Sequence, residues 1–185
     1  MIIKENHEVV IESYLFAESI KDNIKRDMRN FSFINHKING DGGFTNVKAP
    51  QTDVIISVDD FPSVKLLFRW ILNILPYKSR FFNYEILEFW VANYFRGDYT
   101  VSHSHHPSSF SFVYFVESPK GSSPLVFTTS GKQIKAKEGR VVIFTGETIH
   151  HVPKNKCDGR IVLAGNIDAY PRNPLYRKNL NNDAL

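Results

Sequence analysis

Five short runs of β-branched and aromatic residues constrain the fold of this chain more than any other feature. They occupy residues 84–94, 110–116, 125–127, 141–145 and 160–167, and Gly, Pro, Ser or Asn residues lie around their ends. Strands at such spacing, with turn residues between them, are typical of a sandwich or a barrel. We therefore predict an antiparallel jelly roll in the second half of the chain.

Two segments before these runs show helical character. In residues 17–29, Ile20, Ile24 and Met28 repeat every four positions, with charged residues between them. Residues 64–74 form a second, largely apolar segment that follows a proline, which a helix tolerates in its first turn. We predict a helix in each segment and a loop at the glycine-rich residues 40–43.

The chain has the length of one domain. A chain of 185 residues buries about 70% of its extended surface, enough for a core without disulfides. We predict a single domain, mostly β with flanking helices. A helical and mixed layer covers residues 1–83, the jelly-roll core covers 84–168, and a C-terminal tail covers 169–185.

Composition excludes several classes of protein. No apolar run approaches the roughly 20 residues of a membrane span, and the first residues lack the pattern of a signal peptide. Cys157 is the one cysteine, so an internal disulfide is excluded and we expect a reducing cytoplasm. The net charge of +4 is mild and the basic residues do not cluster, which favours a solvated surface over nucleic-acid binding.

Histidines gather in two clusters inside the strand-rich part: His103, His105 and His106 form the first, and His150 and His151 the second. Successive side chains of a strand point to opposite faces, so His103 and His105 share a face and only one of the second pair points inward. A jelly roll can bring such distant strands together, and three imidazoles would leave metal positions open. Either cluster alone is equally consistent with surface or hydrogen-bonding histidines.

Several motifs follow one another in order along this part of the chain. They are residues 90–99, His103-Ser104-His105, residues 111–116, residues 139–144 with His150 after them, and residues 160–166. Together they resemble the Fe(II)/2-oxoglutarate-dependent oxygenase superfamily, and within it the branch related to prolyl hydroxylases. The resemblance implies a double-stranded β-helix with a His-X-carboxylate pair near its start and a distal histidine near its end.

The resemblance also implies a metal site. His103, His105 and His150 match the positions that hold Fe(II), which makes them the expected catalytic and metal-binding residues. This sequence departs from the family at His105, where an aspartate or glutamate is usual. Iron that binds a keto acid through two oxygens, and then dioxygen, can accept only three ligands from the protein.

A binding site for 2-oxoglutarate is implied as well. Arg160 lies ten residues beyond His150, at the position of the arginine that binds the far carboxylate of the keto acid, and a guanidinium suits that bidentate role. Tyr94 matches a tyrosine that binds 2-oxoglutarate in the nucleic-acid demethylase branch, and Tyr114 offers another hydroxyl. Ordinary aromatic packing is an equal alternative for both tyrosines.

Residues 110–117 alternate between two apolar sets, so both faces of this strand should be buried. We expect Tyr114 to face the metal side and Phe115 to pack outward on the N-terminal helices.

The function implied is that of a dioxygenase that uses Fe(II), dioxygen and 2-oxoglutarate to hydroxylate a substrate, with a peptide or protein side chain favoured over a small molecule. A cupin is the main alternative, because cupins place three histidines on the same type of barrel without 2-oxoglutarate, and Arg160 discriminates between the two. A binding module with a structural metal is the third possibility, although structural zinc sites usually have four ligands and favour cysteine.

Overall fold

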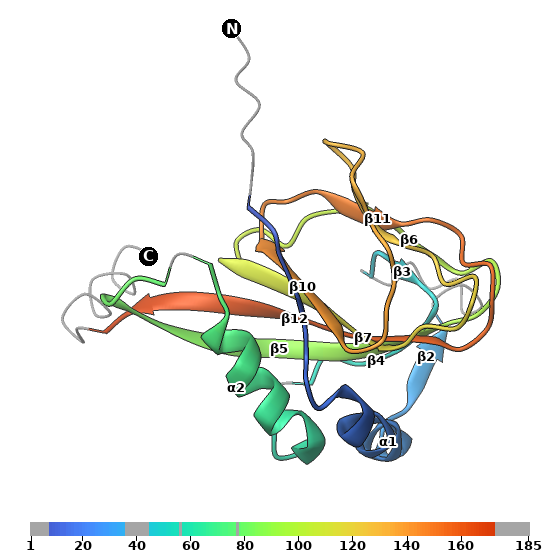
Figure 1. Cartoon of the computed structure of the whole chain (residues 1–185), viewed down its shortest axis with the longest axis horizontal. Helices are drawn as coiled ribbons and strands as arrows, with labels where there is room; N and C mark the ends of the chain where they lie inside the picture. Colours follow the sequence, from blue (N-terminus) through green and yellow to red (C-terminus); the bar gives the residue numbers. More distant parts are fainter. Residues whose placement is uncertain (1–7, 36–44, 56, 77, 173–185) are drawn as a thin grey trace, which may run out of the picture.

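The computed structural model describes residues 8–35, 45–55, 57–76 and 78–172. Its centre is two antiparallel sheets that face each other (Figure 1). In spatial order, the large sheet contains β1 (Val10–Ser13), β10 (Arg140–Thr145), β7 (Phe110–Glu117), β12 (Arg160–Pro171), β5 (Phe82–Tyr94), β4 (Pro50–Thr52) and β2 (Phe33–Asn35). The small sheet contains β3 (Val47–Lys48), β6 (Tyr99–His103), β11 (His150–Val152), β8 (Leu125–Phe127) and β9 (Gln133–Ile134).

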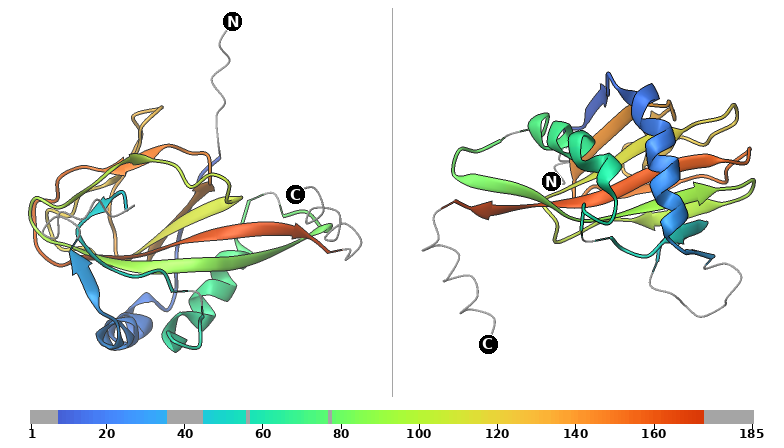
Figure 2. Two further views of the ribbon diagram at one scale, coloured as in Figure 1. Left: turned by 180° about the vertical axis from the view of Figure 1, so that it is seen from behind. Right: turned by 90° about the horizontal axis from the view of Figure 1, so that it is seen from below.

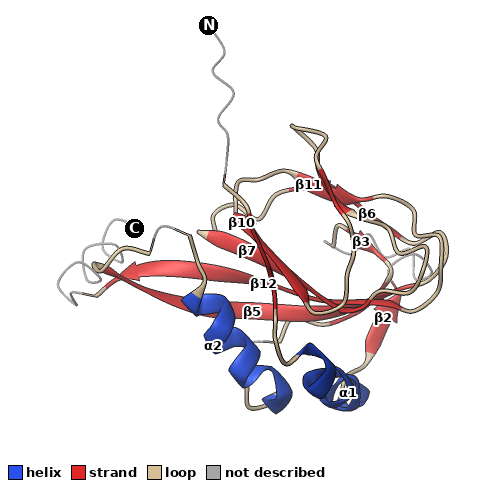
Figure 3. Cartoon of the chain, viewed as in Figure 1, coloured by secondary structure: helices blue, strands red, loops and turns tan. Residues whose placement is uncertain are grey.

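Two helices cover the face of the large sheet that is turned away from the small sheet (Figure 3). They are α1 (Ala17–Asp27), continued by the 3-10 turn Met28–Asn30, and α2 (Lys65–Asn73), preceded by the 3-10 turn Pro62–Val64. Seen from below, α1 lies across the strands rather than along them (Figure 2). Pairing between β5 and β12 extends from Arg160 opposite Tyr94 to Pro171 opposite Phe82, and this long ribbon runs past the small sheet (Figure 1).

The large sheet is apolar on both faces, and each face builds its own core. The helix-side core lies under α1 and α2 and includes Ile24, Leu67, Phe89, Phe112 and Leu163. The inter-sheet core fills the space between the two sheets and includes Phe115, Phe127, Phe144, Val162 and Ala164. Odd positions of β12 face the helices and even positions face the small sheet, as the two-residue period of a strand requires.

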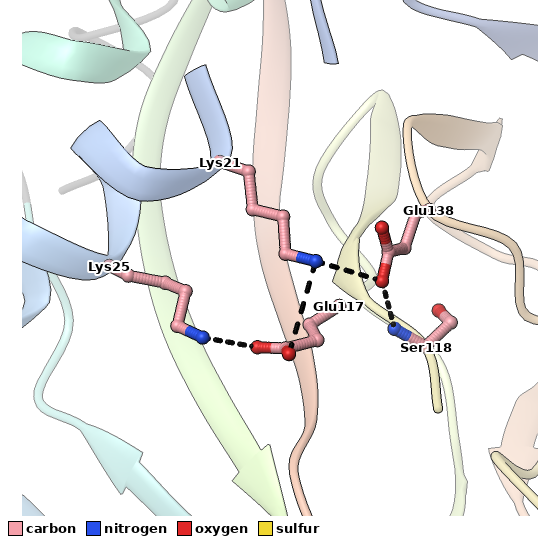
Figure 4. A network of polar contacts seen from close by, with 5 residues as sticks. All are labelled: Lys21, Lys25, Glu117, Ser118 and Glu138. Carbon is pink, nitrogen blue, oxygen red and sulfur yellow. Dashed lines mark hydrogen bonds and ion pairs between the residues drawn. The ribbon is translucent and has the colours of Figure 1, made fainter. Parts of the chain in front are cut away.

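Four charged side chains fasten α1 to the sheet (Figure 4). Lys25 Nζ lies 2.7 Å from Glu117 Oε2, and Lys21 Nζ lies 3.0 Å from Glu138 Oε1 and 3.9 Å from Glu117 Oε1. These side chains are about one quarter to two fifths exposed, so each pair contributes on the order of 0.5 kcal/mol. Burial of apolar side chains such as Ile24 stabilises the attachment of α1 more strongly.

The predicted helices and the five predicted strands are all present, with ends that differ by at most two residues except at the C-terminal end of β12. The N-terminal layer also contains four strands: β1, β2 and β4 extend the large sheet at its two sides, and β3 forms one edge of the small sheet. Residues 169–171, assigned to the tail from the sequence, continue β12, because they pair with β5. The predicted loop at residues 40–43 lies outside the described residues.

The assignment of the two faces of β7 was wrong. Tyr114 belongs to the helix-side core, and Phe115 lies in the inter-sheet core with no exposed surface. Since both faces of β7 are apolar, alternation alone cannot say which face meets the helices. Pairing with β12 decides it, because Tyr114 lies opposite the helix-facing Leu163 and Phe115 lies opposite Val162.

Within the described ranges, neither helix combines the length and the hydrophobicity that a membrane span requires.

Candidate metal and keto-acid site

Three histidines from the small sheet and the loop beside it meet in one place. His103 ends β6 and lies directly opposite His150, the first residue of β11, while His105 follows two residues after β6. One ring nitrogen from each lies within 4.8 Å of the others, and the ring centroids are 4.4 to 5.2 Å apart. The sequence-based expectation that these residues converge is met by this geometry.

A tight loop places His105 beside the strands. Its amide donates a hydrogen bond to the carbonyl of Gly146 (2.7 Å), and its own carbonyl accepts one from the amide of Ser108 (2.9 Å). A Cβ on residue 146 would collide with the carbonyl oxygen of Ser108, so only glycine permits this close approach of the two backbones. The ring centroids of Trp90 and His105 are 5.8 Å apart, so the indole of the large sheet packs beside this imidazole.

Backbone carbonyls orient two of the three imidazoles. His103 Nδ1 lies 2.8 Å from the carbonyl oxygen of Val101, and His150 Nδ1 lies 3.0 Å from that of Thr148. A carbonyl only accepts, so Nδ1 is the protonated donor in both rings and Nε2 keeps its lone pair. This is the arrangement by which proteins present histidine to a metal.

Burial keeps the imidazoles neutral. It lowers the pKa of His105 to about 3, with a further contribution from His150 and His103, and it lowers the pKa of His150 to about 4. The pKa of His103 is also lowered by burial. Because all three pKa values lie below the ordinary value, the rings are unprotonated near pH 7, as metal binding requires.

Among the described residues this cluster contains no carboxylate. Asp98, the acidic residue nearest in sequence to His103, instead accepts a hydrogen bond from the amide of Phe95 and closes a turn. The donor set is therefore three neutral nitrogens, which suits Fe(II) and other divalent transition metals.

Arg160 is the largest fully buried side chain of the described residues. Its Nε donates to the carbonyl of Ser123 (3.2 Å), and its guanidinium carbon lies 4.4 Å above the ring of Tyr94 and 5.4 Å from that of Phe115. Both terminal nitrogens are buried without a hydrogen-bond partner. Burial lowers the pKa of this guanidinium, which nevertheless stays ionised. A buried cation with two idle donors is costly unless an anion binds it.

One cavity between the sheets joins Arg160 to the three histidines. Its lining also includes Tyr94, Thr100 and Val162. The hydroxyl of Tyr94 lies 2.6 Å from Thr100 Oγ1, so a pair of hydroxyl groups belongs to the lining that also contains Arg160. Val162 lines the same cavity without a hydroxyl group, and Thr100 offers one from another strand.

Tyr114 does not belong to this site. Its side chain lies in the helix-side core, on the other face of the large sheet, so its expected role toward the keto acid is corrected. Sequence reasoning missed Thr100 and Ser123. Thr100 lies three residues before His103, on the opposite face of a regular strand, but between these two positions one residue of β11 lies opposite two residues of β6. This bulge turns both side chains toward the cavity.

Solved structures with the same arrangement of strands belong to oxygenases. The viral collagen prolyl hydroxylase of Paramecium Bursaria Chlorella virus-1, in complex with 2-oxoglutarate, is 16% identical, with a TM-score of 0.59 over 88% of this chain and 96% of that one. A 2OG-Fe(II) oxygenase family oxidoreductase from Burkholderia pseudomallei is 12% identical, with a TM-score of 0.64 over 86% and 84%. The chain has the fold of these oxygenases.

A third oxygenase structure agrees with the first two. It is a prolyl hydroxylase from Trichoplax adhaerens in complex with a hypoxia inducible factor peptide, 12% identical with a TM-score of 0.63, over 86% of this chain and 83% of that one. No family model matches the sequence. No curated protein matches it either. The double-stranded β-helix expected from the motifs is thus confirmed through the oxygenase fold, at a sequence identity that speaks to fold alone.

Proposed function

We propose that this protein is an Fe(II)- and 2-oxoglutarate-dependent dioxygenase that hydroxylates its substrate. The observation that carries the proposal is the pair of unpartnered Arg160 nitrogens in the same cavity as three convergent, neutral histidines. A metal site alone would also suit a cupin. A buried guanidinium that lacks an anion adds a specific requirement, which the far carboxylate of a keto acid satisfies.

The residues divide the work between metal and co-substrate. His103, His105 and His150 would hold the iron, with Nε2 of the two oriented rings and one nitrogen of the third as donors. Bound iron supplies the chemistry by which dioxygen and the keto acid react. Arg160 binds the far carboxylate, and Tyr94 with Thr100 adds hydroxyl groups beside it.

The overall reaction balances without another redox cofactor. Substrate C–H, dioxygen and 2-oxoglutarate yield substrate C–OH, succinate and carbon dioxide, with one oxygen atom in the alcohol and the other in succinate. Decarboxylation of the keto acid supplies the two electrons that dioxygen needs beyond those of the C–H bond. The apolar walls of the cavity, among them Leu125 and Val162, limit the access of water to the site.

For the prime substrate we propose a chemical class. Prolyl hydroxylases are among the proteins of similar fold, and one was solved with a peptide, which supports a peptide or protein side chain. A small molecule remains the alternative, since fold is a poor guide to substrate. We also propose that the protein works in a reducing cytoplasm, because Cys157 is the one cysteine of the chain.

Oxygen consumption by the iron-loaded protein tests the proposal. With 2-oxoglutarate present, dioxygen should disappear while succinate forms in equal amount, even slowly and without the prime substrate if an external reductant converts the second oxygen atom to water. The variant His150→Ala should lose both. Dioxygen consumption that does not depend on 2-oxoglutarate would favour the cupin alternative. Tight retention of zinc with neither activity would favour a structural metal.

A further inference from the structure

A row of polar side chains crosses the inner face of the large sheet next to the metal site. It consists of Glu88 on β5, Asn166 on β12 and Ser111 on β7, and Asn166 lies directly opposite each of the other two. Asn166 Nδ2 donates to Glu88 Oε1 (2.6 Å), and Ser111 Oγ donates to Asn166 Oδ1 (2.8 Å). Both ends of the carboxamide are therefore held, and they fix the position of the Glu88 carboxylate.

Strand parity places this row relative to the cavity. On β12, Arg160, Val162 and Ala164 line the cavity, and Asn166 is the next residue on the same face. On β5, Trp90 lines the cavity and lies beside His105, and Glu88 is two residues further along. Two residues of a strand span about 7 Å. The row therefore lies two residues along the strands from Trp90 and Ala164, on the side away from Arg160.

The two ends of the cavity-lining face of the large sheet differ in their exposure to solvent. Arg160 is completely buried, whereas Glu88 and Trp90 are partly exposed. A keto acid bound to Arg160 would occupy the closed end, so the prime substrate must approach the metal from the open end. Glu88 lies at that end, two residues beyond Trp90 of the cavity lining.

The charge of Glu88 is not balanced by any lysine, arginine or histidine among the residues that the structure describes, because none of them forms an ion pair with it. Its hydrogen-bond partner there is the neutral carboxamide of Asn166, which uses one of about four acceptor positions of a carboxylate. A partly buried, oriented carboxylate with free acceptor positions attracts a cationic donor more than any neutral group.

We propose that Glu88 binds a cationic group of the prime substrate, an ammonium or a guanidinium, while a nearby carbon of that substrate lies at the metal. The inference rests on the proposed function, because it takes the open end of the cavity as the substrate entrance. It narrows the substrate class to molecules or peptide side chains with a basic nitrogen several bonds from the oxidised carbon.

Matched probes test the charge requirement on the full chain, loaded anaerobically with Fe(II) and 2-oxoglutarate. The pairs are Nα-acetyl-arginine methylamide against its citrulline analogue, and Nα-acetyl-lysine methylamide against its norleucine analogue. Each compound is titrated by calorimetry. We expect at least one cationic probe to bind roughly tenfold or more tightly than its neutral partner, as a charge-assisted hydrogen bond would give.

The variant Glu88→Gln keeps the shape and the acceptor for Asn166 but removes the charge, so the preference should fall to less than about twofold. The control Glu12→Gln changes an exposed carboxylate on β1, at the far edge of the same sheet, and should retain the preference. Equal or undetectable binding of the probes in each pair, or an unchanged preference in Glu88→Gln, overturns the inference. Failure of 2-oxoglutarate itself to bind, measured first, would instead overturn the proposed function.

Discussion

Replacement of Arg160 by methionine separates co-substrate binding from folding. Methionine fills most of the volume of the arginine stem, so the buried cavity stays closed while the charge is lost. In the wild type, both terminal nitrogens are free to bind the far carboxylate of 2-oxoglutarate. Loss of one partner of such a buried charge pair costs about 2–5 kcal/mol, which raises the Kd for 2-oxoglutarate by roughly 30-fold to roughly 5,000-fold.

The stability of the protein without ligand should change little, because opposing contributions nearly cancel. Methionine removes the hydrogen bond from Nε to Ser123, about 1.5–3 kcal/mol, and the stacking on Tyr94, up to about 2 kcal/mol. It also removes two buried donors without partners, each unfavourable by about 1–3 kcal/mol. We therefore expect the melting temperature of the ligand-free variant to stay within a few degrees of the wild type.

Calorimetric titration of 2-oxoglutarate into the anaerobic metal-loaded protein measures the first effect, and thermal unfolding measures the second. The variant Arg160→Lys should recover only part of the affinity, since it keeps the charge and loses the planar fork. Arg140→Met is the matched control, because that guanidinium donates to the carbonyl of Lys135 at the surface. An unchanged Kd in Arg160→Met would refute the assignment of the anchor.

Three further experiments test other parts of the structure. His150→Ala should abolish stoichiometric metal binding, measured by metal content after dialysis, while His151→Ala should retain it; the reverse result would show that the wrong histidine was assigned. Gly146→Ala forces a Cβ against the carbonyl of Ser108 and so displaces the loop that carries His105. Metal affinity in a competition assay should then fall by roughly 10- to 100-fold, as it does when residues that orient metal ligands are changed. An affinity equal to that of the wild type would contradict this packing. Glu117→Gln breaks partly exposed ion pairs to α1 and should lower the free energy of unfolding by less than about 1 kcal/mol in denaturant titration, so a larger loss would mean that these pairs matter more than their exposure suggests.

Sequence patterns were sufficient where one local rule governs the outcome. The runs at 110–116 and 160–167 became β7 and β12 because a buried strand needs little beyond continuous β-branched and aromatic residues. His103 meets His150 because the jelly-roll topology pairs their strands, whereas His105 lies beyond the end of β6 and reaches them through the loop that packs on Gly146. Arg160 was predicted from the resemblance and its position ten residues beyond His150, and its complete burial at the start of an apolar strand explains why it needs an anion.

Patterns failed where the outcome depends on neighbouring strands. Tyr114 and Phe115 were assigned to the wrong faces because both faces of β7 are apolar, and only its pairing with β12 distinguishes them. Thr100 escaped notice because a bulge in β6 changes the parity between it and His103. Bulges and edge strands such as β3 depend on partners far along the sequence, and no window of ten or so residues contains them.

The central claim is that His103, His105, His150 and Arg160 form one centre for iron and 2-oxoglutarate. Addition of 2-oxoglutarate to the anaerobic Fe(II) protein, followed by visible absorption, tests it most directly. We predict a charge-transfer band that saturates at about one equivalent of 2-oxoglutarate, that is absent in His150→Ala, and that requires much more ligand in Arg160→Met. An iron-loaded wild type that develops no band, and binds no 2-oxoglutarate, would contradict the account.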